Sequence, residues 1–388
     1  MRVQRVLLLA LLVCSSFAIA GTTANPPLGA LGKPEPVAEG VELYRYDGES
    51  LTDPPSPQSI RLLRLDPQRV RLSSVLATGE IPGRATVQDI ARRTDAIAAV
   101  NAGFFSPSGD PNGLLEIDDR LVSDTRRARG AVAVLDSDRG IDLLFDRVTA
   151  RAVLRVRSAS GWRTLPIDGV DTVRGAGRLV LYSPASGPTT DTTGGVEWVL
   201  TGRPLKASPP TTSGNSAIPP GGYVVSYGGT APPSNLAGLA RATAVQVREV
   251  LDVHSRQRQQ DWRRATTLVG GAGLLVRDGK PLGEWAIEGL SKGFDVTRHP
   301  RTVIARGADR AIWLVTIDGR QPDRAHGMTF AAMQALLSRL GAVDALNLDG
   351  GGSTTMVVRG AVVNRPSDIT GPRAVSDALI VTARPSGG

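Results

Sequence analysis

The chain has 388 residues, of which 41% are hydrophobic and 21% charged, and its formal net charge is +8. This composition is typical of a globular protein long enough for one large domain or two ordinary ones. A single cysteine and three histidines exclude a disulfide scaffold, a cysteine-based zinc site and a cysteine-rich redox centre.

Residues 1–20 have the pattern of a secretory signal peptide. Two arginines precede an apolar run from Val6 to Val13, and an A-x-A cleavage pattern ends at Ala20. The run is too short to span a bilayer, so no transmembrane segment is expected here. We expect a secreted or periplasmic protein, cleaved near Ala20. A lipoprotein processed at Cys14 is the second interpretation, because the preceding Val13 is larger than the small residue that such sites usually carry.

The next segment, residues 21–40, is rich in proline and small residues and is predicted to be a flexible leader. One large domain is expected over residues 41–385. Alternating apolar residues predict strands at 60–65 and 70–76. A helix is predicted to follow, with Thr86 as its N-cap, and a buried strand at 96–100.

Further strands are expected through the middle of the chain, at 131–135, 141–145, 152–156, 179–182, 196–200, 223–227 and 244–251. In the last third, a strand at 311–317 precedes a helix whose apolar residues run at helical spacing from Phe330 to Leu340. Strands at 343–348, 354–358 and 361–364 end the pattern. These elements predict an α+β fold, with mixed β-sheets and crossover helices in a single large domain.

Two places share one order of elements: a helix, a buried strand, and then a polar residue followed by glycine. The first ends at Asn101 and the second at Asp349. Ligands of α/β sheets tend to lie beyond the carboxyl ends of strands, and glycine lets a ligand approach the backbone there. Both places are therefore candidate site positions.

The run Asp349-Gly350-Gly351-Gly352-Ser353 has two interpretations, a β-hairpin turn and a binding site. A two-residue hairpin turn does not need three glycines, so we favour the site. Asp318-Gly319 also ends a strand, and its local sequence favours a plain turn. Asn101 is either part of a turn supported by buried phenylalanines or a ligand of sugar hydroxyls, and the sequence leaves both open. No metal-ligand spacing connects the three histidines, which we interpret as structural or peripheral.

Several motifs in this order resemble the phosphodiester glycosidase family over most of the chain after residue 40. They are V-N-A-G-F-F (100–105), G-G-A-G-L-L-V-R-D-G (270–279), P-R-T-V-I-A (300–305), D-G (318–319), A-L-N-L-D-G-G-G-S-T-T-M (345–356), N-R-P-S-D (364–368) and R-A-V-S (373–376). The chain departs from the family pattern at Ala305 and Asp119, where glycine is usual. Neither departure removes a polar site group.

The resemblance implies hydrolysis of the bond between the anomeric carbon of a sugar and a phosphodiester. Glycosyl transfer normally uses two carboxylates, and the resemblance suggests Asp349 and Asp318 as that catalytic pair. Arg301 is expected to act with them by holding the charge of the leaving phosphate. The other expected substrate-binding residues are Asn101, Gly350, Gly351, Ser353, Asp368 and Arg373, with Glu116 as a reserve carboxylate.

The expected partner is a glycan or sugar-phosphate polymer of a cell wall, capsule or exopolysaccharide, and no nucleic acid. The oligomeric state is left open. No cofactor is indicated, and Ca²⁺ or Mg²⁺ near the aspartates is an alternative that no ligand spacing supports. Two other functions compete: a non-catalytic glycan-binding protein of exopolysaccharide assembly, and a phosphodiesterase that cleaves the P–O bond.

Overall fold

The computed structural model describes residues 31–385 except 53 and 237, so the expected signal peptide and Cys14 lie outside the described residues. The expected leader runs into the first strand, β1 (Glu35–Ala38), which pairs with β2 (Val41–Gly48). Residues 35–38 thus belong to a sheet, and residues 21–30 are not described.

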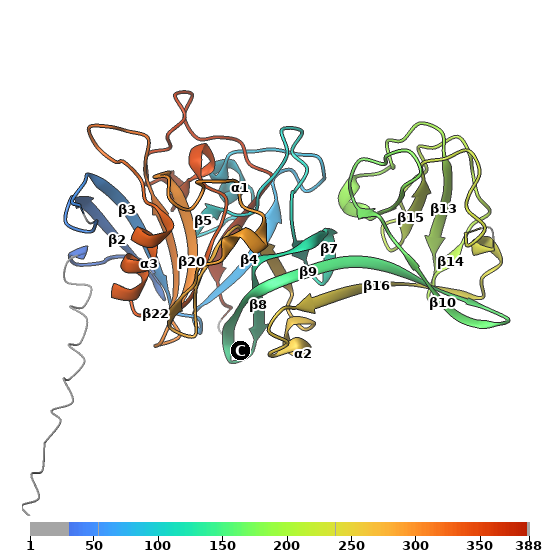
Figure 1. Ribbon diagram of the computed structural model, residues 1–388, viewed down its shortest axis with the longest axis horizontal. Coiled ribbons are helices and arrows are strands. Elements are labelled where there is room, and N and C mark those ends of the chain that lie inside the picture. The colour runs from blue at the N-terminus through green and yellow to red at the C-terminus, as the bar shows by residue number, and fades with distance from the viewer. Residues whose placement is uncertain (1–30, 53, 237, 386–388) are drawn as a thin grey trace, which may run out of the picture.

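An eight-stranded sheet forms one wall of the body of the molecule (Figure 1). Its order is β1, β2, β3 (Gln58–Leu65), β21 (Ile312–Ile317), β20 (Arg301–Gly307), β22 (Ala342–Asn347), β18 (Leu274–Arg277) and β19 (Lys280–Pro281). All of its neighbouring strands are antiparallel.

A five-stranded sheet packs beside it in the order β24 (Ala361–Val362), β23 (Met356–Val358), β5 (Ala98–Asn101), β25 (Asp377–Ala383) and β4 (Val70–Leu76). A seven-stranded sheet has the path β10 (Gly161–Pro166), β9 (Gly140–Ser158), β8 (Thr125–Ser137), β17 (Thr267–Gly270), β6 (Leu115–Ile117) and β7 (Arg120–Ser123), with β16 (Ala244–Val253) also paired to β9. Leu314, Val132 and Leu379, one from each of the three sheets, belong to the same buried apolar cluster.

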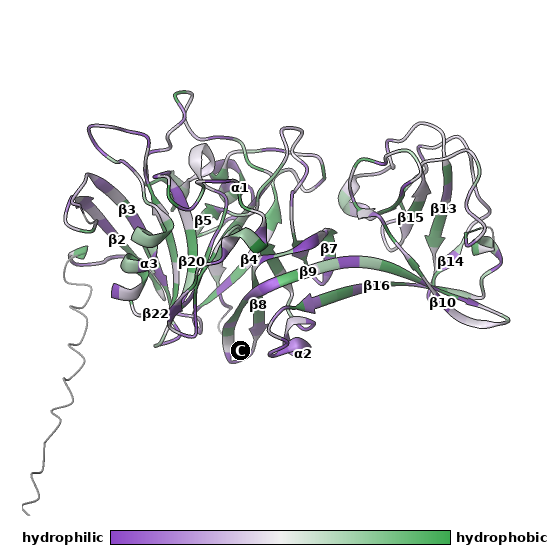
Figure 2. Ribbon diagram, in the orientation of Figure 1, coloured by the Kyte–Doolittle hydropathy of each residue, from purple (hydrophilic) through white to green (hydrophobic). Residues whose placement is uncertain are grey.

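The strands β9 and β16 extend side by side from the body to a smaller lobe (Figure 1). The lobe is a five-stranded sheet in the order β11 (Gly169–Val170), β12 (Leu179–Tyr182), β15 (Tyr223–Tyr227), β13 (Val196–Thr201) and β14 (Lys206–Ala207). Its core joins Trp198 of β13 to Leu154 of β9. In Figure 2 the green, apolar residues concentrate on the strands, whereas many of the loops are pale or purple.

Two of the three α-helices in the described part of the chain cross over a strand. The helix α1 (Val87–Arg93) connects β4 to β5 across β25, and α3 (Phe330–Arg339) connects β21 to β22 across β20. Thr86 caps α1 by accepting a hydrogen bond from the Asp89 N–H, as predicted. The short α2 (Gln259–Trp262) and the 3₁₀ turns η2 (Pro184–Ser186), η3 (Leu239–Arg241), η4 (Trp285–Glu288) and η5 (Gly351–Ser353) lie in loops.

The predicted fold class therefore needs correction. The protein is mostly β, with 45% of the described residues in strands and 10% in helices, and its sheets are less mixed than expected. Among the described strand pairs, β11 and β12 alone run parallel. The predicted strands at 141–145 and 152–156 are one 19-residue strand, β9, because polar residues between them stay in extended pairing with β8 and β16.

Candidate functional site

The segment Asp349–Ser353, here called the glycine loop, lies where the ends of several strands meet. The N–H of Asp349 donates to the carbonyl of Ala102, just after β5, at 3.0 Å. The N–H of Gly351 donates to the carbonyl of Pro300, just before β20, at 2.9 Å. Gly351 has a φ of +60°, in the left-handed region that favours glycine. The loop is thus fixed between both sheets.

Asp349 is the best placed of the predicted catalytic residues. Burial, with a smaller contribution from the charge of Asp377, raises the pKa of its carboxyl to about 6 against the opposing effects of Ser353, the Gly350 N–H and Arg373. The Gly350 N–H donates to Oδ1 of Asp349 at 2.9 Å. A carboxyl with this pKa is mostly ionised at neutral pH and still basic enough to accept a proton, which is typical of catalytic carboxylates.

Asp377, at the start of β25, is a second carboxyl of this site that the sequence reasoning missed. Its Oδ2 accepts the N–H of Gly103 at 3.1 Å, and its Oδ1 accepts the hydroxyl of Ser376 at 2.8 Å. Burial raises its pKa to about 6 as well. It directly follows the R-A-V-S motif, which was the available signal.

Asp368 and Arg373 form a bidentate ion pair that packs against the glycine loop. Nε and Nη2 of Arg373 donate to the two carboxylate oxygens of Asp368 at 2.8 and 3.1 Å. A Cβ on Gly352 would lie 2.2 Å from Nη2 of Arg373 and 2.2 Å from Oδ1 of Asp368. Only glycine at position 352 therefore lets the pair pack against the loop. The predicted residues Asp349, Gly350, Gly351, Ser353, Asp368 and Arg373 thus converge.

Arg320 is a second arginine beside the glycine loop, and the sequence reasoning did not identify it. Its Nη2 lies 3.1 Å from where a Cβ on Gly351 would be, and 3.3 Å from Nδ1 of His299. Burial lowers the pKa of His299, as do the charges of Arg301 and Arg320, so its ring is neutral at neutral pH. Among the described residues, no carboxylate forms an ion pair with Arg320. Its position directly after Asp318-Gly319 was the signal in the sequence.

Asp318 is buried and holds a neighbouring loop. Its carboxylate accepts the side-chain amide of Asn364 at 2.9 Å and the N–H of Arg365 at 3.0 Å. Burial raises its pKa, and these two donors oppose that effect. The same Asn364 amide donates to the carbonyl of Thr354, at the end of the glycine loop. This geometry favours a positioning role, and the catalytic role of Asp318 stays a prediction.

Arg301 is buried between two phenylalanine rings, with its Cζ 4.7 Å from the ring centre of Phe294 and 4.9 Å from that of Phe330. Its Nε donates to the carbonyl of Met328, and its Nη2 to those of Phe294 and Thr297. Burial lowers its pKa to about 10. These donors hold the segment before β20, which favours a structural role over the expected phosphate clamp.

Asn101 is fully buried, and its amide ties three segments together. Its Nδ2 donates to the carbonyl of Asp349 at 2.7 Å, and its Oδ1 accepts the hydroxyl of Thr302 at 2.7 Å and the N–H of Thr355 at 3.1 Å. Asn101 therefore positions the glycine loop from below, and this burial favours a turn-supporting role over a sugar ligand.

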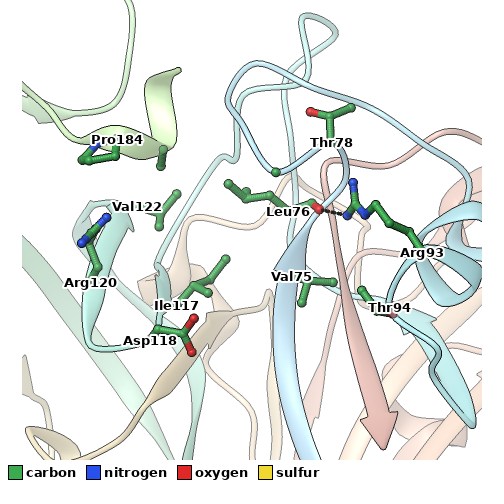
Figure 3. A pocket seen from close by; sticks show the side chains of 12 residues that line it. Val75, Leu76, Thr78, Arg93, Thr94, Ile117, Asp118, Arg120, Val122 and Pro184 are labelled. Carbon is green, nitrogen blue, oxygen red and sulfur yellow. Dashed lines mark hydrogen bonds between the residues drawn. The ribbon is translucent and has the colours of Figure 1, made fainter. Parts of the chain in front are cut away.

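Glu116 belongs to a different region. It lies on β6, where burial raises its pKa to about 9 and the neighbouring Glu249 contributes to the increase. Next to it, a pocket of about 560 Å³ is lined by Arg93, Asp118 and Arg120 together with apolar side chains (Figure 3). The lining comes from β4, the end of α1, the β6–β7 turn and η2 rather than from the glycine loop, so Glu116 does not join the Asp349 cluster.

Within the described residues, no group of three histidine, cysteine or acidic side chains is arranged to hold a metal ion. In the same part of the chain, no helix combines the length and the apolar character that crossing a membrane requires.

Residues 194–382 match the phosphodiester glycosidase family. A stretch of 112 residues is 35% identical to the SPbeta prophage-derived uncharacterized protein YomE of Bacillus subtilis, covering 28% of this chain and 16% of that protein. Two solved structures are similar. A hypothetical protein from Synechocystis has a TM-score of 0.75 and 24% identity, over 91% of this chain and 64% of that one. A candidate exported protein of Burkholderia pseudomallei has a TM-score of 0.69 and 25% identity, over 84% and 74%.

The chain thus spans less than two thirds of the length of YomE and of the Synechocystis protein. All residues that converge on the glycine loop from the second half of the chain, from His299 to Asp377, lie inside the matched range 194–382. The segment 194–382 thus matches the phosphodiester glycosidase family, which confirms the resemblance found in the sequence motifs of this part of the chain.

Proposed function

We propose that this protein hydrolyses the anomeric C–O bond of sugar-1-phosphodiesters and releases free sugar and a phosphomonoester. The observation that carries the proposal is the Asp349 carboxyl, with its raised pKa, on a glycine loop that Arg320 approaches at Gly351 and Arg373 at Gly352. The match of residues 194–382 to the phosphodiester glycosidase family supports the same reaction.

Asp349 is the carboxylate that we assign to the anomeric carbon. The transition state of glycosyl transfer resembles an oxocarbenium ion, which an adjacent anionic carboxylate stabilises. Asp349 can serve as the general base for water or as the nucleophile, and both roles require its ionised form. We assign Asp377 a supporting role, in which it accepts the N–H of Gly103 and raises the pKa of the Asp349 carboxyl.

The leaving group is assigned to the two arginines. When the C–O bond breaks, its electron pair goes to the phosphate oxygen, and the attacking water supplies the oxygen of the free sugar. A phosphate monoester is a weak base and needs less protonation than an alkoxide. Arg320 and Arg373 would stabilise its charge, because planar guanidinium groups bind phosphate oxygens in pairs.

The deciding experiment is hydrolysis of the methyl phosphodiester of N-acetylglucosamine 1-phosphate in oxygen-18 water. The proposal expects the label in the sugar. Label in the phosphate would identify a phosphodiesterase that cleaves the P–O bond, and binding without product would identify a glycan-binding protein. Either result would overturn the proposal.

Asp349→Asn tests the residue assignment in the same assay. We expect kcat to fall by about 100-fold or more, because the loss of a positioned acid–base group costs this much. Asp278→Asn is the matched control, since that carboxylate is 71% exposed and lies outside the cluster. A rate within a few-fold of the unmodified protein for Asp349→Asn would show that the carboxylate is assigned wrongly.

We further propose that the glycosidase domain consists of residues 41–385 together with the strand β1, and that the protein acts outside the cytoplasm, on glycans of a cell wall, capsule or exopolysaccharide. The signal-like pattern of residues 1–20 and the likeness to a candidate exported protein support this location. N-terminal sequencing of the protein recovered from periplasm or medium tests it, and a chain that keeps residues 1–20 in the cytoplasm would contradict it.

A further inference from the structure

The two strands that lead from the body to the lobe carry a basic face with one aromatic residue. This arm face consists of Arg151, Arg155 and Arg157 on β9, Arg248 on β16, and Trp162 on β10. In Figure 2 these strands alternate between green and purple, as expected where one side of a strand is buried and the other faces water.

The strand register places these five side chains on one side of the sheet. Arg157 pairs directly with Trp162, and Val153, four residues earlier on β9, lies opposite Arg248. Side chains two residues apart on a strand share a face, as do directly paired side chains. The Cζ atoms of Arg155 and Arg157 lie 4.9 and 5.9 Å from the ring centre of Trp162, which confirms the shared face.

The arginines of the arm face form no ion pair with a carboxylate of the described residues, although Asp252, which pairs with Thr149, shares their face. Among the described residues, the one side-chain bond that the four arginines make joins Nε of Arg248 to Gln246. Many other arginines of the protein do have carboxylate partners, for example Arg147 with Glu288. Glu249 is adjacent to Arg248 in sequence but points to the opposite face, where its carboxylate accepts the N–H of Leu121.

Trp162 keeps two of these cations in place. It is 39% exposed, and the guanidinium groups of Arg155 and Arg157 lie over its ring. Cation–π contacts of this kind restrict the arginine rotamers, which lowers the entropy lost when an anion binds. The remaining exposed ring surface offers an apolar contact beside the charges.

We propose that the arm face binds a polyanionic glycan, namely a polymer whose sugar units are joined through phosphodiesters. Successive residues of a strand rise by about 3.3 Å, so the cations from Arg151 to Arg157 extend over about 20 Å. A single phosphate monoester spans far less than this. A row of unpaired cations is complementary to a chain with recurring negative charges, and it would hold such a polymer while the glycine loop acts on one linkage.

The choice of a glycan rests on the proposed function, in which the substrate itself is a sugar phosphodiester. The residues of the arm face favour it over nucleic acid. Proteins that bind single-stranded nucleic acids stack successive bases on several aromatic side chains, whereas Trp162 is the one aromatic residue among the five.

The test is binding of poly(N-acetylglucosamine-1-phosphate) by the full chain carrying Asp349→Asn, which prevents degradation of the probe. In this background, Arg151→Gln, Arg155→Gln and Arg157→Gln together should weaken binding by about tenfold or more at low salt, and the difference should shrink as salt rises. Neutral dextran should bind neither form. A triple variant that binds the phosphate polymer as tightly as its parent would overturn the proposal.

Two controls test whether a loss of binding comes from the arm face rather than from the lower net charge, and whether the ligand is a glycan rather than a nucleic acid. Arg69→Gln, Arg92→Gln and Arg264→Gln remove the same charge from side chains that are 58%, 69% and 77% exposed elsewhere, and should change affinity by less than about twofold. An equal loss in this control would refute a localised site. Tighter binding of a 20-nucleotide single-stranded DNA than of the glycan would refute the assigned ligand.

In a chain with Asp349 intact, the arm-face triple variant should hydrolyse the small methyl phosphodiester at an unchanged rate. If the parent chain does not hydrolyse it at all, the proposed function fails, while the binding comparison still decides whether the arm face holds the polymer. Arg248→Gln serves as a second variant on the neighbouring strand and should weaken polymer binding in the same direction.

Discussion

Replacing Gly352 by alanine is the sharpest local perturbation that the structure offers. The new Cβ would lie 2.2 Å from Nη2 of Arg373, where ordinary contacts begin at 3.4 Å. The guanidinium would therefore have to move by about 1.2 Å, and a misplacement of this size costs about 100-fold in rate when the group must meet the reacting atoms. We expect kcat/KM for the methyl phosphodiester to fall by about that factor.

The same substitution should barely change stability. The side chains of Arg373 and Asp368 are 44% and 26% exposed, so solvent screens their ion pair, and such pairs contribute about 0–1 kcal/mol. The free energy of unfolding from urea titration should therefore change by about 1 kcal/mol or less. A large loss of activity with little loss of stability is the signature of a misplaced site group.

The matched control is Gly221→Ala, because no atom lies within 4 Å of the Cβ it would add and its φ is not in the left-handed region. This variant should keep both its activity and its stability. If Gly352→Ala retained kcat/KM within about threefold of the unmodified protein, the pair over the glycine loop would not contact the substrate, and Arg373 would lose its assigned role.

Three further outcomes follow from the site. Because Asp349, with a pKa of about 6, must be ionised, kcat/KM should fall as pH drops through 6, to about a tenth of its plateau at pH 5, and a flat pH–rate profile from 5 to 8 would contradict this. Arg320→Ala should lower kcat/KM on the phosphodiester by about 10- to 100-fold and spare a p-nitrophenyl glycoside, and equal losses on both would argue against phosphate binding. Arg301→Ala should lower the free energy of unfolding by about 3 kcal/mol in urea titration, because buried carbonyls lose their donor, and should reduce activity on both substrates equally, whereas a selective loss on the phosphodiester would restore its role as a phosphate clamp.

The local elements of the fold were predictable because their signals lie within a few residues of each other. Thr86 and Asp89 mark the start of α1, and the apolar spacing from Phe330 to Leu337 marks α3. The sheet partners were not predictable, because β25 comes from the end of the chain and pairs with both β4 and β5 from near its beginning. The alternation within a strand fixes its two faces but does not specify which strand lies beside it.

In the candidate site too, residues that are adjacent in the sequence were predictable, whereas contacts between distant segments were not. The glycine loop was recognised because a carboxylate, three glycines and a hydroxyl are contiguous in the sequence. The partners of Asp349 come from distant segments: Asn101 from β5, Arg373 from the loop before β25, and Asp377 from β25 itself. No spacing in the sequence indicates that these residues meet.

The sequence predicts Arg301 as the residue that holds the phosphate, but its buried position disfavours that role. A comparison with its neighbour Thr302 shows why the sequence is misleading here. Successive residues of a strand face opposite sides of the sheet. Arg301 shares its face with Val303, which packs in the apolar cluster under α3, so its guanidinium is directed toward Phe294 and Phe330.

Thr302 faces the other side and donates to Asn101 beneath the glycine loop. In the P-R-T motif, Arg301 therefore points into the core and Thr302 points toward the candidate site. The position of α3 in the fold shows which of the two side chains faces the core, and the sequence does not. Arg320 lies in a turn rather than in a strand, so the alternation of strand faces does not fix its direction. Its guanidinium approaches the glycine loop at Gly351.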